Sequence, residues 1–96
     1  MELIKTQENG DATSNYNVIT NKKTVIEFLY ELRKEVKTKQ EWGDVHVGFC
    51  KKIATYDRNG AFQFTEDLIE YSNKPIKRVW ANGGWGLMSY YITIEE

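Results

Sequence analysis

The sequence predicts an α+β domain in which one long helix packs on one face of a mainly antiparallel, twisted sheet of about five to six strands. Three observations predict this class: one stretch with helical periodicity, several short runs with the composition of strands, and connections rich in turn-forming residues. The expected element order is β-β-α-β-β-(short α)-β-β. Because 96 residues are near the common size of one domain, residues 1–96 are expected to form a single domain.

The long helix is predicted to span about residues 22–40. Asn21 is expected to cap its N-terminus by accepting a hydrogen bond from a first-turn amide. Gly43 is expected to adopt the left-handed conformation after its last turn. The apolar side chains recur at i, i+3, i+4, i+7 and i+11, which places them on one helix face: Val25, Phe28, Leu29, Leu32 and Val36.

Strand composition appears on both sides of this helix. The predicted strand runs are residues 2–6, 16–20, 45–50, 53–56, 61–65, 76–81 and 87–94. Lys51-Lys52 lie between the runs 45–50 and 53–56 and are expected to mark a bulge or a break. Alternation along 45–50 predicts that Val45, Val47 and Phe49 share one face, and that His46, Gly48 and Cys50 share the other. A single helix covers only part of one sheet face. The other face is therefore expected to be polar, to carry its own aromatic cover, or to meet a partner.

The first clear hairpin signal is the run Asp57-Arg58-Asn59-Gly60, because Asn and Gly tolerate the positive φ that tight turns require. A four-residue loop here would place Phe62 opposite Thr55 and Phe64 opposite Ile53.

Two later connections are also predicted. Residues 65–71 form either one or two helical turns capped by Thr65 or a continuing strand, and Pro75 follows this segment. A second hairpin joins 76–81 to 87–94, and Asn82, Gly83 and Gly84 are expected to supply the backbone freedom for its turn.

Charge and cysteine content limit the classes of function. The net charge of -1 gives no long-range field that would draw the chain onto nucleic acid or an anionic membrane. No run approaches the roughly 20 apolar residues that a membrane span needs, and residues 1–5 lack the pattern of a signal peptide. The lone Cys50 cannot form an internal disulfide. These features predict a cytoplasmic protein that does not contact a membrane.

No set of catalytic or metal-binding residues is evident. His46 and Cys50 are the only residues of their types, and on one strand they would lie about 13 Å apart, too far to share a ligand. We therefore expect an ordinary strand histidine and a buried thiol. The glycines of 83–86 match neither a dinucleotide fingerprint nor a phosphate-binding loop. The sequence predicts a non-enzymatic protein without cofactor or metal.

A protein-interaction module is the favoured function, with the partner either a second copy or a host or element protein. Its candidate surface combines an uncovered sheet face with the second hairpin, because tryptophan and tyrosine most often anchor interfaces. The residues are Trp80, Trp85, Tyr91, Arg78 and Lys77. The position of the Trp85 ring distinguishes two interpretations of the hairpin. If the ring packs on the sheet, the hairpin has a structural role only. If the ring projects into solvent, Trp85 is a candidate contact for a partner.

A sheet that binds single-stranded nucleic acid is the alternative. Bases stack on exposed rings that are flanked by cations. The strand aromatics are Tyr56, Phe62, Phe64, Trp80, Tyr90 and Tyr91, interleaved with Lys51, Lys52, Arg58, Lys77 and Arg78. However, the adjacent Tyr90 and Tyr91 must face opposite ways, and Phe62 and Phe64 are expected in the core. We therefore place this function second.

Three segments together, "NKKTVIEFLYEL", "EWGDVHVG" and "VWANGGWGLMSYYITI", resemble a pattern found in small uncharacterised proteins of bacterial conjugative elements and phages. The resemblance covers about Asn21 to Ile94. It implies an accessory protein of a mobile element, and it supplies no catalytic residues for this chain.

Overall fold

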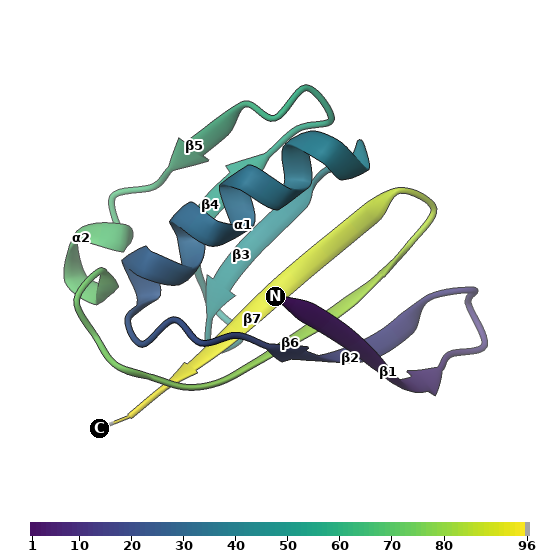
Figure 1. Cartoon of the computed structure of the whole chain (residues 1–96), viewed down its shortest axis with the longest axis horizontal. Helices are drawn as coiled ribbons and strands as arrows, with labels where there is room; N and C mark the ends of the chain where they lie inside the picture. The colour runs from purple at the N-terminus through teal and green to yellow at the C-terminus, as the bar shows by residue number, and fades with distance from the viewer. Residues whose placement is uncertain (96) are drawn as a thin grey trace.

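The computed structural model describes residues 1–95 and has two helices and one seven-stranded sheet (Figure 1). Along the chain the elements are β1 (Glu2–Glu8), β2 (Ser14–Ile19), α1 (Val25–Lys39), β3 (Gly43–Val47), β4 (Lys51–Tyr56), β5 (Phe62–Phe64), α2 (Leu68–Tyr71), β6 (Ile76–Gly84) and β7 (Leu87–Ile94). The α+β class is confirmed. The sheet, however, has more strands than the predicted five to six.

The sheet is mixed, with strand order β1-β2-β6-β7-β3-β4-β5. Every neighbouring pair is antiparallel except β3 and β7, which run parallel. The cause is α1, because a helical crossover carries the chain from β2 past β6 and β7 and lets β3 run in the same direction as β2. The break between these two runs lies at residues 48–50, where the chain reverses, and not at the two lysines. Lys51 and Lys52 belong to β4 and pair with Val47 and His46.

The helix begins at Val25, three residues later than predicted, and its N-cap is Thr24 rather than Asn21. Thr24 and Glu27 form a capping box in which each side chain accepts a hydrogen bond from the other's backbone amide. The left-handed residue at the C-terminus is Gln40, with φ 54°, so the prediction for Gly43 is wrong. Gly43 lies in β3, where a Cβ would come within 2.0 Å of the Met88 carbonyl oxygen.

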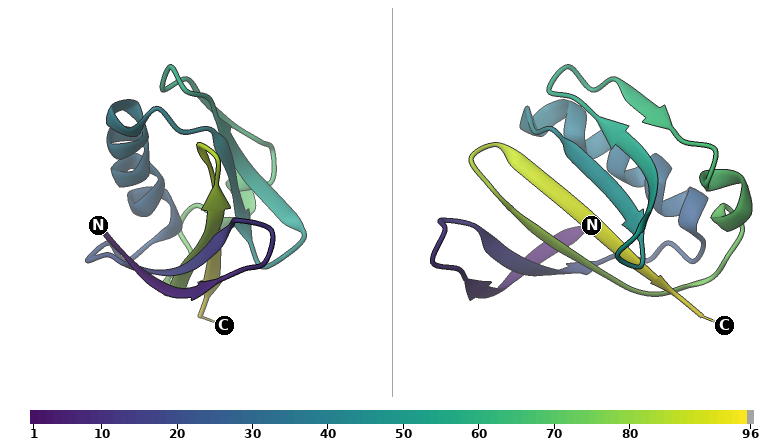
Figure 2. Two further views of the ribbon diagram at one scale, coloured as in Figure 1. Left: turned by 90° about the vertical axis from the view of Figure 1, so that its right-hand side faces the viewer. Right: turned by 180° about the vertical axis from the view of Figure 1, so that it is seen from behind.

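The core lies between α1 and one face of the sheet, which curves around the helix (Figure 2). All five apolar residues that predicted the helix are fully buried. Phe28 meets Tyr90 of β7 edge to face, with ring centroids 6.1 Å apart. Tyr90 therefore marks the covered face. Tyr91, the next residue, points to the opposite side, which we call the open face.

The β4–β5 hairpin has a register one residue away from the prediction. Phe62 pairs with Tyr56 and Phe64 with Ala54. The amide of Asp57 donates to the Ala61 carbonyl at 3.0 Å, which closes a loop of three residues instead of four.

For residues 65–71 the structure has a helical turn, α2, and not the alternative of a continuing strand. Thr65 does not cap it, because the Thr65 hydroxyl donates to the Lys52 carbonyl at 2.6 Å. Neither helix within residues 1–95 has the length and apolar content that a membrane crossing requires.

Candidate functional site

The turn between β6 and β7 consists of two residues, Trp85 and Gly86. Gly84 pairs with Leu87, and the two residues between them have φ values of 60° and 78°. Positive φ at both central positions is the pattern of a type I′ turn, in which Asn and Gly are preferred. The prediction that Asn82, Gly83 and Gly84 form the turn is therefore wrong.

Gly83 and Gly84 have a different role, because each lets another chain segment pass close to β6. A Cβ on Gly83 would lie 2.2 Å from the Leu87 carbonyl oxygen, and one on Gly84 would lie 2.7 Å from that of Ala12. The glycines thus bring the β1–β2 turn and β7 against β6, and the tip of the hairpin is left to Trp85 and Gly86.

Trp85 projects into solvent at this tip, with 83% of its surface exposed. Two further apolar side chains lie beside the turn: Leu87 is 42% exposed and Trp42 is 47% exposed. The backbone of Trp42 holds this arrangement, since its amide donates to Gly86 at 3.0 Å and its carbonyl accepts from Met88 at 2.9 Å. Arg58 reaches over the Trp42 ring, with its guanidinium carbon 5.0 Å from the ring centroid. We call Trp42, Arg58, Trp85 and Leu87 the hairpin-tip patch.

A second aromatic group crosses the open face on one line of paired residues. Trp80 of β6, Tyr91 of β7 and His46 of β3 are cross-strand neighbours. The Trp80 and Tyr91 rings stack at 4.3 Å, and the Tyr91 and His46 rings stack at 5.1 Å. The three rings therefore stand upright against one another and present their edges to solvent.

Phe49, in the β3–β4 turn, belongs to the same aromatic group. Its ring centroid lies 6.0 Å from Trp80 and 6.2 Å from Tyr91, in tilted orientations. The side chain is nonetheless 79% exposed. The prediction that Phe49 shares a face with Val45 and Val47 is wrong, because the chain leaves the strand at Gly48, which has φ 65°.

One cation of the open face is paired with a carboxylate, and another is hydrogen-bonded to a neutral side chain. Lys52 and Asp44 form an ion pair at 3.3 Å, and Arg78 donates to the Asn17 side-chain oxygen at 3.0 Å. Burial lowers the pKa of His46 below its ordinary value of 6.5, an effect that Asp44 opposes and Lys52 adds to. His46 is therefore neutral at physiological pH.

The structure brings together only part of the predicted interaction surface. Trp80, Tyr91 and Arg78 lie together on the open face, and Lys77 lies exposed at the register shift between Ile76 and Arg78. Trp85 is separate from them, at the far end of the β6–β7 hairpin (Figure 1). Its neighbours Trp42 and Leu87 were not predicted, because no sequence periodicity connects residue 42 with residue 87.

The aromatic residues named for nucleic-acid binding divide between the two faces. Tyr56 and Tyr90 are buried on the covered side of the sheet. Phe62 stacks on Tyr56 at 5.5 Å on that side, and Phe64 follows Phe62 in a tilted contact at 5.6 Å. Only Trp80 and Tyr91 of the six lie on the open face.

His46 and Cys50, the two residues considered for catalysis or metal binding, lie in different elements. His46 lies in β3, whereas Cys50 lies in the turn that follows and is exposed rather than buried as predicted. Within residues 1–95, no group of three or more His, Cys, Asp or Glu side chains is placed to hold a metal ion.

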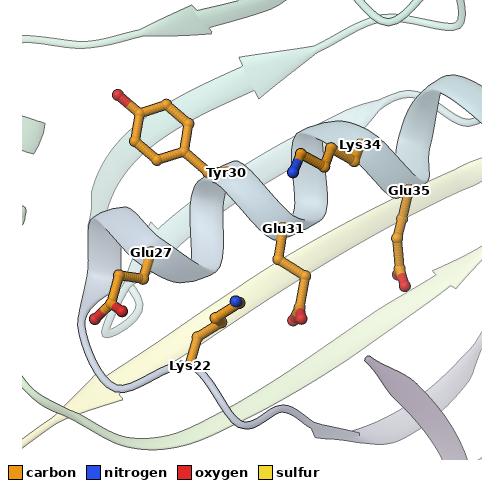
Figure 3. Close-up of a pocket in the computed structure, with 6 residues that line it drawn as sticks. All are labelled: Lys22, Glu27, Tyr30, Glu31, Lys34 and Glu35. Atoms are coloured by element: carbon orange, nitrogen blue, oxygen red, sulfur yellow. The ribbon is translucent and has the colours of Figure 1, made fainter.

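A cleft of about 420 Å³ lies along one flank of α1, lined by Lys22, Glu27, Tyr30, Glu31, Lys34 and Glu35. Figure 3 shows that Glu31 and Glu35 point to one side of the helix while Tyr30 points to the other. Glu27 accepts from the Thr24 hydroxyl at 2.7 Å and Glu31 accepts from that of Thr20 at 2.7 Å. These two carboxylates tie the helix to the preceding segment, so this cleft offers no converging reactive groups.

Comparison of the chain with protein-family models, with curated proteins and with solved structures finds no match.

Proposed function

We propose that this chain is a non-enzymatic protein-interaction domain that binds a separate protein through the hairpin-tip patch, with Trp85 as the anchor. One observation carries the proposal: the most exposed tryptophan of the chain occupies a backbone conformation that does not suit it.

The conformation of Trp85 is energetically unfavourable. A residue with a Cβ in the left-handed region is destabilised by roughly 1–2 kcal/mol relative to the right-handed one, and a bulky residue there is an outlier. Asn or Gly at this position would relieve most of that strain. The exposed ring buries little apolar surface in return. Because neither backbone preference nor packing accounts for a tryptophan here, a contact with a partner is the remaining reason for it.

The chemistry of the patch defines the partner. The Trp85 side chain protrudes from the hairpin tip, and Leu87 and Trp42 extend its apolar surface toward the sheet. The partner should therefore offer an apolar pocket that accommodates an indole ring. Arg58 forms no ion pair with a carboxylate among residues 1–95. A carboxylate at the rim of the partner's pocket would complement it.

The cellular setting belongs to the same proposal. The single cysteine supports a reducing, cytoplasmic location. The resemblance of residues 21–94 to proteins of conjugative elements and phages supports an accessory role in such an element.

The replacement Trp85→Asn tests the proposal, because asparagine suits the type I′ turn but removes the indole. Crosslinked capture from cell extract, followed by reconstitution with the purified partner, should show binding by the parent and at least tenfold weaker binding by the variant. Tyr30→Ala is the matched control, since Tyr30 is also an exposed aromatic but lies on α1. The proposal fails if no partner can be reconstituted, or if Trp85→Asn binds as tightly as Tyr30→Ala.

A further inference from the structure

Four exposed cations lie on, or directly after, two chain segments at the end of the sheet opposite the hairpin tip. Two chain segments meet there, because the Ile76 amide donates to the Lys23 carbonyl at 2.8 Å and the Val25 amide donates to that of Lys74 at 3.1 Å. The cations are Lys23, Lys74, Lys77 and Arg78, which we call the basic end. None of them pairs with a carboxylate within 4.0 Å in the described part of the chain. Glu95 lines the same hollow as Lys77 but lies beyond ion-pair distance of it.

Phe49 lies beside the basic end. Arg78 and Trp80 are two residues apart on β6 and so project from the same face, and the Phe49 ring lies 6.0 Å from that of Trp80. The Gly48 amide donates to Ile92 at 3.0 Å, which fixes the turn carrying Phe49 near the end of β7. Phe49 and Arg78 thus both lie next to Trp80 on the open face.

Phe49 is the most exposed of the four rings Phe49, Trp80, Tyr91 and His46. Tyr91 is stacked between Trp80 and His46, so its two faces are occupied. Phe49 contacts Trp80 and Tyr91 only in tilted orientations and is 79% exposed. A planar group can therefore stack on Phe49 without any rearrangement of the three stacked rings.

We propose that the basic end and Phe49 together bind a short stretch of single-stranded nucleic acid, in which one base stacks on Phe49 and the phosphates on either side contact the cations. A base supplies the planar face and its backbone supplies evenly spaced negative charge, and this pairing of a ring with cations is how single strands are bound without sequence preference. An acidic protein surface would satisfy the cations but leave the Phe49 ring without a stacking partner. The inference concerns a different end of the molecule from the hairpin-tip patch, so either proposal can fail alone.

Fluorescence anisotropy of labelled oligothymidylate and oligouridylate, each about twelve nucleotides long, tests the inference at low salt. We expect saturable binding of at least one strand, which Phe49→Ala weakens roughly tenfold through lost stacking and Phe49→Tyr retains. The double variant Lys77→Gln/Arg78→Gln should also bind at least tenfold more weakly. Its slope of log affinity against log salt should fall by about 1.4, for two lost phosphate contacts.

The double variant Lys34→Gln/Lys37→Gln is the matched control. It removes two exposed cations of α1 that also form no ion pair within residues 1–95, and it should change the affinity less than twofold. The inference is overturned if neither strand binds, or if the control weakens binding as much as Lys77→Gln/Arg78→Gln does. It is also overturned if polyglutamate of equal charge competes as well as unlabelled oligothymidylate, because the site would then recognise acidic polypeptides. Circular dichroism of each variant checks that it is folded before its affinity is compared with that of the parent.

Discussion

Trp80 and Tyr91 stack on the open face of the sheet with ring centroids 4.3 Å apart and an interplanar angle of 15°. The two residues are direct cross-strand neighbours on β6 and β7, where aromatic pairs stabilise a sheet most effectively. The stack explains how a sheet with a helix on only one side tolerates large rings on the other, since each ring shields the neighbouring ring from water.

The stack should contribute a measurable coupling energy. We expect a double-mutant cycle with Trp80→Ala and Tyr91→Ala to give about 0.5–1.5 kcal/mol, the range for aromatic pairs beyond their buried area. Urea unfolding of the parent, the two single variants and the double variant measures it. Additive effects would mean that the rings are placed side by side without stabilising one another.

Replacement of Trp85 should raise stability. Because φ at this position is 60°, we expect Trp85→Asn to increase the free energy of unfolding by about 1 kcal/mol, as the turn becomes Asn-Gly. Trp85→Ala keeps the strain of a Cβ and should leave stability within about 0.5 kcal/mol of the parent, as for an exposed side chain. A stability loss in Trp85→Asn by urea unfolding would show that the indole packs on the sheet and supports the hairpin.

Two buried tyrosines should respond in opposite ways to loss of the hydroxyl. The Tyr56 hydroxyl donates to the Met88 carbonyl, so Tyr56→Phe should destabilise the chain by about 1 kcal/mol or more, because that carbonyl is buried. The Tyr90 hydroxyl is buried and has no hydrogen-bond partner within residues 1–95. Burial raises the pKa of Tyr90, and the charges of Glu41 and Glu35 raise it further.

For Tyr90→Phe we therefore expect no loss of stability, or a small gain, because the replacement removes a buried polar group without breaking a bond. Thermal and urea unfolding of the two variants side by side measure the contrast. Equal losses in both would indicate that the Tyr90 hydroxyl is satisfied in solution.

The helix and the α+β class were predictable because they depend on local signals. The five apolar residues of α1 follow a spacing that only a helix places on one face, and all five are buried. The start of the helix was missed although part of its signal is local, because Thr24 and Glu27 have the spacing of a capping box. A distant segment also contributes. The Val25 and Ile26 amides donate to carbonyls of Lys74 and Ser72, and no feature near Asn21 in the sequence indicates those acceptors.

The mixed sheet and the hairpin-tip patch were not predictable for the same kind of reason. β3 pairs with β7 across more than forty residues of chain, and alternation along a strand carries no information about its neighbours. At the second hairpin, the glycine count indicated a turn at Gly83 and Gly84, whereas these glycines are required by close backbone approach. Trp85 could be identified as a candidate contact, but Trp42 could not be placed beside it.

Stability should fall on mild acidification because of His46. Burial holds the pKa of His46 below 6.5 in the folded chain, so the folded state favours the neutral ring. As the pH falls through 6.5, the unfolded chain takes up a proton that the folded chain does not, and the free energy of unfolding decreases. The decrease continues until the pH is below the folded pKa and then levels off.

The variant His46→Phe isolates this contribution, because phenylalanine keeps a planar ring against Tyr91 and does not titrate. We expect the free energy of unfolding, measured in urea between about pH 7.5 and pH 5, to decline less in the variant than in the parent. Carboxylates that titrate in this range affect both proteins equally, so the difference belongs to His46. Parallel declines would show that the His46 pKa is the same in the folded and unfolded chains, and a steeper decline in the variant would show that the folded state raises it.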